Sequence, residues 1–95
     1  MDAVVELPVS DVWGRVRTAA ASQGWVMSTG GLPAMPEEPM AFHRGFGSMQ
    51  PGWQLIVQLF ALSPTSTKVV VREWRGPTPV DGYDAQRMLR AIAPA

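Results

Sequence analysis

The chain has 95 residues, of which 46% are apolar and 17% are charged, and its 8 basic and 8 acidic side chains give a formal net charge of zero. This length suits one domain with one thin core, so we expect a single domain spanning 1–95. The apolar content excludes a disordered tail, and the balanced charge argues against nucleic acid as a partner. The absence of cysteine excludes disulfides, thiolate metal sites and cysteine nucleophiles.

The apolar segments show no pattern that directs a chain into or across a membrane. Asp2 and Glu6 interrupt the first apolar run, where a secretory signal needs about 7 to 15 uninterrupted apolar residues. The segment 53–62 contains two glutamines and is too short to span a bilayer. The sequence therefore predicts a soluble cytoplasmic protein without a membrane partner.

Hydrophobic periodicity and turn residues indicate a series of helices and strands. Between Ser10, a favourable N-cap, and Gly24, a favourable C-cap, apolar side chains recur at helical spacing. Gly14 inside this helix costs about 1 kcal/mol relative to alanine, and a close approach to a strand would explain it. The elements expected in order are a strand at 4–7, a helix from 10 to 24, strands at 25–28, 40–46, 53–62 and 67–75, and a helix that begins between 81 and 84.

This order, β-α-β-β-β-β-α, predicts an α+β fold. The last four strands follow one another directly, which favours an antiparallel meander. Two amphipathic helices on one face of a sheet of four or five strands would complete a two-layer domain.

The last predicted hairpin carries the most information about function. One face of its first strand is entirely apolar and is expected to contact the helices, while the other face mixes glutamines with apolar residues. If the turn has four residues, Leu62 lies opposite Thr67 and Phe60 opposite Val69, whereas a bulge would exchange the two faces of the second strand. With the four-residue turn, the outer face carries a patch of Ile56, Phe60, Leu62, Val69 and Val71.

Contiguous exposed apolar surface usually marks an interaction site. The leading hypothesis is therefore a non-enzymatic interaction module that forms a homodimer or docks on a protein partner, through this face or an exposed edge of the sheet. Two plainer interpretations stay open: the loop at 29–39 folds over the patch, or single exposed apolar residues need no explanation.

A second hypothesis is a binding protein for an apolar small molecule. Its ligand would lie in a groove between helix and sheet, lined by Trp53, Trp74 and Met88 and by the loop at 29–39. Tryptophans supply large apolar surfaces and methionines supply adaptable walls. The same residues are also typical of ordinary core packing.

No catalytic constellation is apparent. His43 is the only histidine, and no metal-binding motif surrounds it. The adjacent pair Glu37 and Glu38 lies in the predicted loop, where water would keep both groups ionised, although a general acid needs a buried carboxyl group. We therefore expect no catalytic residue, no metal site and no cofactor, and predict that the chain is not an enzyme.

The spacing of several segments resembles small helix-grip domains. The segment 10–13 (Ser-Asp-Val-Trp), then Val16, then 24–26 (Gly-Trp-Val) is similar to the first half of the repeated domains of outer-membrane assembly lipoproteins. The segments 67–71 and 85–89 resemble the last strand and last helix of those domains. The wider group includes START-like and polyketide-cyclase-like proteins, among them lipid- and polyketide-binding proteins with a deep pocket. The resemblance implies at most a non-catalytic binding domain. The chain lacks the lipid-bearing cysteine of those lipoproteins.

Overall fold

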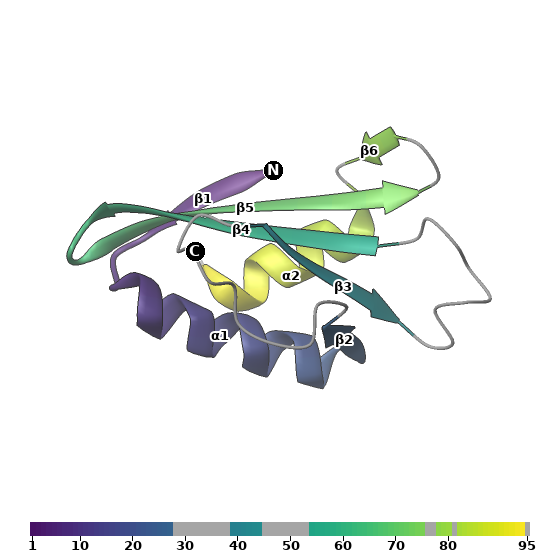
Figure 1. The fold of residues 1–95 in the computed structure, drawn as a ribbon, viewed down its shortest axis with the longest axis horizontal. Helices are drawn as coiled ribbons and strands as arrows, with labels where there is room; N and C mark the ends of the chain where they lie inside the picture. The colour runs from purple at the N-terminus through teal and green to yellow at the C-terminus, as the bar shows by residue number, and fades with distance from the viewer. Residues whose placement is uncertain (28–38, 45–53, 76–77, 81, 95) are drawn as a thin grey trace.

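In a computed structural model, the chain forms an antiparallel sheet with both helices on one of its faces (Figure 1). The structure describes residues 1–27, 39–44, 54–75, 78–80 and 82–94. The elements in chain order are β1 (Asp2–Val5), α1 (Val9–Ser22), β2 (Trp25–Met27), β3 (Met40–Arg44), β4 (Gln54–Ser63), β5 (Ser66–Arg75), β6 (Thr78–Val80) and α2 (Tyr83–Ile92).

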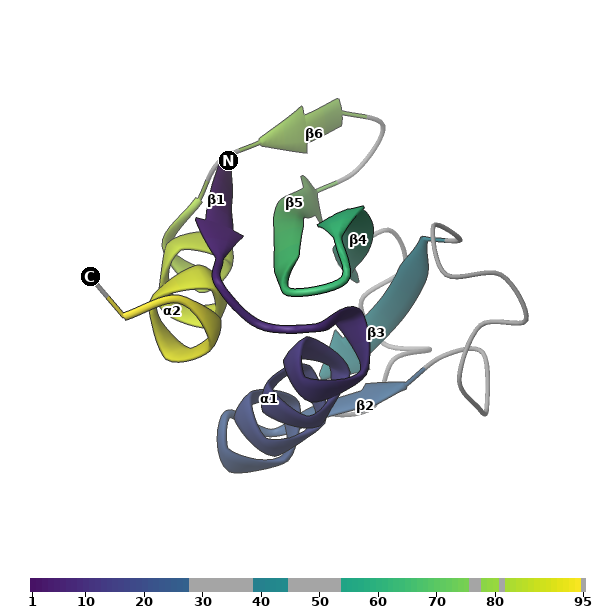
Figure 2. The same ribbon diagram turned by 90° about the vertical axis from the view of Figure 1, so that its left-hand side faces the viewer.

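The sheet has the strand order β1-β5-β4-β3-β2, and every neighbouring pair is antiparallel. Helix α1 connects β1 and β2, the two ends of this path, and packs on the helix side of the sheet. The sheet curves around the helices (Figure 2). The α+β prediction, an antiparallel sheet with two helices, is confirmed; five strands form this path, and β6 makes a sixth strand beside it. The short strand β6, which the sequence did not indicate, pairs with the end of β5.

Helix α1 forms because one stripe of apolar side chains faces the sheet. Its buried residues are Val12, Trp13, Val16, Ala19 and Ala20. The helix begins one residue before the expected cap: Pro8 is the N-cap, and its carbonyl accepts hydrogen bonds from the next turn of backbone. Ser10 therefore lies inside the first turn. At the other end Gly24 has a φ of 80°, the left-handed conformation that ends helices and favours glycine.

Gly14 is not explained by a close approach to a strand. A Cβ atom built at this position meets no atom within 4 Å. The glycine instead lines an open hollow of about 590 Å³ between α1 and the end of α2. The expectation of tight helix–strand packing at Gly14 is therefore wrong.

The β4–β5 hairpin supplies the centre of the core, and its register differs from the four-residue-turn prediction. At the tip, Ser63 pairs with Ser66, which agrees with that prediction. The register then shifts by one residue between Ala61 and Ser63, so that Ala61 lies opposite Thr67. Because side chains alternate along a strand, this bulge exchanges the two faces of β5.

The exchange places Val69 and Val71 in the core. Val69 pairs with Leu59 and Val71 with Val57, and all four side chains are fully buried. The predicted outer-face position of Val69 and Val71 is therefore wrong. Val69 and Val71 belong to one core with Met40 and other apolar side chains of the sheet. The two helices cover this face of the sheet. The buried apolar residues outside α1 are Val5, Trp25, Met40, Phe42, Leu55, Val57, Leu59, Val69, Val71, Ala85, Met88 and Ile92.

Candidate interaction surface

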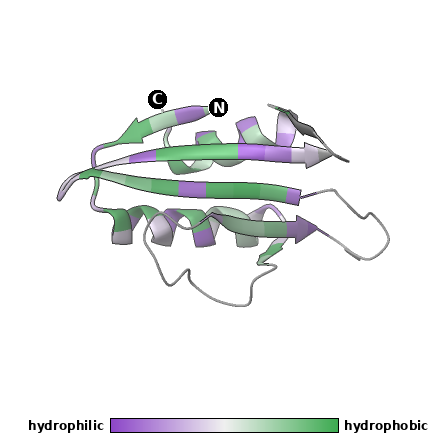
Figure 3. Ribbon diagram, turned by 45° about the horizontal axis from the view of Figure 1, so that its top comes forward, coloured by the Kyte–Doolittle hydropathy of each residue, from purple (hydrophilic) through white to green (hydrophobic). Residues whose placement is uncertain are grey.

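The face of the sheet opposite the helices carries apolar and polar residues in a checkerboard. Along β4 and along β5, every second outward side chain is apolar and the ones between are polar. Figure 3 shows the two kinds of residue along these strands, with both helices on the same side of the sheet. Each outward cross-strand pair joins one apolar and one polar residue: Phe60–Lys68, Gln58–Val70, Ile56–Arg72 and Gln54–Trp74.

The apolar positions of this outer face continue onto the edge strands. Val4 on β1 and Val26 on β2 are 53% and 54% exposed, and Ile56, Phe60, Val70 and Trp74 are half-buried. Among the helices and strands of the described ranges, none packs on this face. We call it the outer face, with apolar positions Val4, Val26, Ile56, Phe60, Val70 and Trp74.

The residues of the predicted patch divide among three places. Ile56 and Phe60 lie on the outer face, as expected. Leu62 lies at the bulge near the hairpin tip and is 55% exposed. Val69 and Val71 lie in the core. Sequence reasoning missed Val70 and Trp74, which the exchanged register turns outward in their place.

The residues of the predicted ligand groove do not come together. Met88 is fully buried in the core beneath the sheet, whereas Trp74 lies on the outer face. Trp53 and nearly all of the loop at 29–39 fall outside the described residues. A groove lined by both Trp74 and Met88 is therefore absent, because the sheet separates them.

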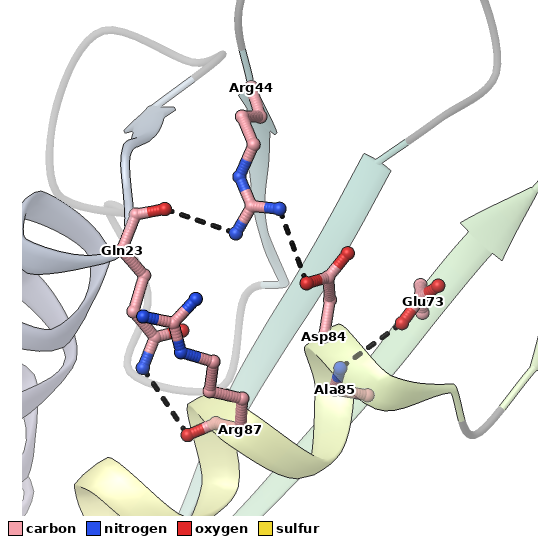
Figure 4. A network of polar contacts seen from close by, with 6 residues as sticks. All are labelled: Gln23, Arg44, Glu73, Asp84, Ala85 and Arg87. Atoms are coloured by element: carbon pink, nitrogen blue, oxygen red, sulfur yellow. Dashed lines mark hydrogen bonds and ion pairs between the residues drawn. The ribbon is translucent and has the colours of Figure 1, made fainter.

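A buried carboxylate caps the second helix. Glu73 on β5 is fully buried, and its Oε1 accepts a hydrogen bond from the backbone N–H of Ala85 at 3.1 Å (Figure 4). This N–H belongs to the first turn of α2, where backbone donors lack partners within the helix and negative charge is favourable. Gly82, the N-cap residue, provides no side chain for this purpose. The strand therefore supplies the cap that the helix sequence lacks.

Arg44, at the end of β3, lies beside this cap and contacts α2, β2 and the residue that follows α1. Its Nη1 lies 3.2 Å from Oδ1 of Asp84 on α2, and its Nη2 donates to the carbonyl of Gln23 at 3.0 Å (Figure 4). Its guanidinium carbon lies 4.1 Å from the centre of the Trp25 ring on β2, a cation–π contact. Asp84 is only 5% exposed, so Arg44 compensates a buried charge.

This polar cluster has a structural role. Gln23, just after α1, also donates from Nε2 to the carbonyl of Arg87 at 3.3 Å, which fixes the end of α1 against α2. Both acidic groups already hold a partner, Glu73 at Ala85 and Asp84 at Arg44. In the parts of the chain that the structure describes, no three histidine, aspartate or glutamate side chains lie close enough to hold a metal ion.

Sequence reasoning missed this cluster. Glu73 belongs to the inward row of Thr67, Val69 and Val71, where a charged side chain is unexpected. That anomaly becomes visible only once the register is known.

Comparison with other proteins does not assign the chain to a family. No protein-family model, curated protein or solved structure matches the chain. No helix within the described residues has the length and apolarity needed to cross a membrane.

Proposed function

We propose that the chain is a non-enzymatic interaction module that self-associates through its outer face. The observation that supports this proposal is the set of apolar side chains on the outer face, which comes from four strands (β1, β2, β4 and β5) and is exposed or half-buried. The helices bury the other face of the sheet, and no helix or strand of the described ranges covers the outer face. Two sheets that pack face to face form a core about 10 Å thick between them.

Charge favours a second copy over a strongly charged partner. The formal net charge is zero, so two copies approach without long-range repulsion. On the outer face, Lys68 lies 3.8 Å from Asp2, and such a surface pair offsets part of the local charge. Polar and apolar residues alternate on the outer face. The methylene groups of its long polar side chains can therefore pack against apolar residues of the facing sheet.

The size of the outer face determines how strongly two copies of the chain are expected to associate. Strand spacing of about 4.8 Å and a rise of about 3.4 Å per residue give a flat area on the order of 500 Å². A standard interface buries roughly 800 Å² on each partner. We therefore expect a dimer that dissociates on dilution.

Other parts of the proposal rest on the sequence. A cytoplasmic location is part of the proposal and is argued from the amino-acid composition alone. A helix-grip relationship would suit a binding domain of this layout. The hollow of about 590 Å³ beside Gly14 is open and lined in part by Asp11, Arg15 and Thr18, so it does not favour an apolar small-molecule ligand.

Sedimentation analysis of Phe60→Arg tests the proposal. Phe60 lies on the outer face and is half-buried, so an arginine there puts a charge into the proposed contact. Tyr83→Arg is the matched control, because Tyr83 is 68% exposed on the helix side of the molecule. We expect the unmodified chain and Tyr83→Arg to dimerise at micromolar concentration, and Phe60→Arg to stay monomeric with an unchanged circular dichroism spectrum.

Two outcomes contradict the proposal. One is an equal dimer fraction in all three proteins, which places the contact elsewhere. The other is loss of the dimer in Tyr83→Arg alone, which places the contact on the helices. Val70→Lys offers a second test of the same face if Phe60→Arg does not fold.

A further inference from the structure

The only histidine of the chain, His43, lies on the outer face of the sheet. It pairs with Val26 of β2, whose side chain is 54% exposed. Two residues earlier on the same strand, Ala41 pairs with Ile56 of the outer face. Side chains two residues apart on a strand share a face, so His43 and Ala41 point to the same side. His43 is half-buried and therefore stands on the surface through which two copies would associate.

The described residues that flank His43 on the neighbouring strands carry no charge. On β2 the outward neighbour is Val26, and on β4 the nearest outward residue is Gln54. Arg44, the next residue of β3, points to the helix side of the sheet and pairs with Asp84 there. Protonation of His43 would therefore put a positive charge beside uncharged residues of these two strands.

The other charged residues of the outer face lie on β5 and β1. Lys68 and Arg72 point outward from β5, and Asp2 of β1 lies 3.8 Å from Lys68. The Met1 ammonium, just before β1, lies at the opposite end of the strand order from β2 and β3. In a symmetric contact each face meets an identical face, so every charge is present twice. A positive charge added to a face with two cations and one anion therefore opposes association.

We propose that self-association through the outer face depends on pH, because the contact requires His43 to be uncharged. Histidine is the side chain whose charge commonly changes between about pH 5 and 8. In the contact a protonated imidazole would lose water and face the cations of the second copy, so the monomer binds the proton more readily than the dimer. Association therefore weakens as the pH falls through this range. The inference rests on the proposed function and adds a regulation of the same surface.

Sedimentation analysis at pH 7.5 and pH 5.5 tests the proposal, with circular dichroism to check folding at both. The dimer of the unmodified chain should dissociate at least about tenfold more readily at pH 5.5, since its formation then releases up to two protons. His43→Gln keeps a neutral side chain and every other titratable group. Its dissociation constant should therefore change less than about twofold between the two pH values. His43→Lys carries a fixed charge and should associate weakly at both.

Two results overturn the inference and leave the proposed function standing. One is a dimer of equal strength at both pH values, and the other is an equal weakening at pH 5.5 in His43→Gln, which assigns the pH dependence to another group. If the unmodified chain unfolds at pH 5.5, His43→Lys at pH 7.5 decides the question, because a dimer as strong as that of the unmodified chain contradicts the inference. A folded chain that stays monomeric at every pH overturns the proposed function and the inference together.

Discussion

Gly82 leaves the space that the carboxylate of Glu73 occupies. A Cβ atom built on Gly82 would lie 2.7 Å from both carboxylate oxygens and 2.8 Å from the carboxyl carbon. Glu73 cannot easily withdraw, because it is fully buried and holds the N–H of Ala85. The end of β5 and the start of α2 are thus fitted to each other at one residue pair.

We predict that Gly82→Ala destabilises the fold by about 1–3 kcal/mol, because the added methyl group displaces the buried carboxylate from its cap. Urea unfolding measures the change. The effect should shrink in a Glu73→Ala background, where the obstructing group is gone, and this non-additivity identifies the contact. Equal costs in both backgrounds would show that the clash is not the cause.

Gly14→Ala should have the opposite effect. An added Cβ meets nothing within 4 Å, so the substitution gains helix propensity without a clash. We expect the free energy of unfolding to rise by about 1 kcal/mol, with the same measurement as for Gly82→Ala. A destabilised Gly14→Ala variant would mean that α1 is packed more tightly on this side than the structure shows.

The register of the last hairpin can be tested with two adjacent valines. Val69 is fully buried opposite Leu59, whereas Val70 faces outward opposite Gln58. Val69→Ala should cost about 2 kcal/mol through a lost core contact, and Val70→Ala no more than about 0.5–1 kcal/mol. Thermal unfolding of the two variants gives the comparison. A larger cost for Val70→Ala than for Val69→Ala would instead support the register with the four-residue turn.

The sequence was sufficient for every element except the short strand β6, but not for this register. Apolar periodicity identified α1 and the β4–β5 hairpin, since burying one face constrains the sequence strongly. It could not locate the bulge near Leu62, because a shift of one residue depends on turn geometry rather than on composition. The error at Val69 and Val71 follows from that shift alone. The helix cap at Glu73 could not be predicted for a related reason. It joins β5 to α2, and the two residues come together only in the folded chain.

The contributions of Arg44 and Asp84 to the free energy of unfolding should be coupled. Removing the guanidinium in Arg44→Ala leaves the carboxylate of Asp84 buried without its cation, so we expect a loss of about 1–3 kcal/mol. The figure is modest because the Arg44 side chain is 36% exposed, and water partly screens the pair. A double-mutant cycle with Asp84→Asn isolates the coupling. A coupling energy of zero would show that Arg44 acts only through Trp25 and Gln23.

The most direct test of the central claim is native mass spectrometry of the unmodified chain over a range of concentrations. Self-association through the outer face predicts a dimer at low micromolar concentration that dissociates on dilution, with no retained small molecule. A folded chain that stays monomeric at every concentration would contradict the account.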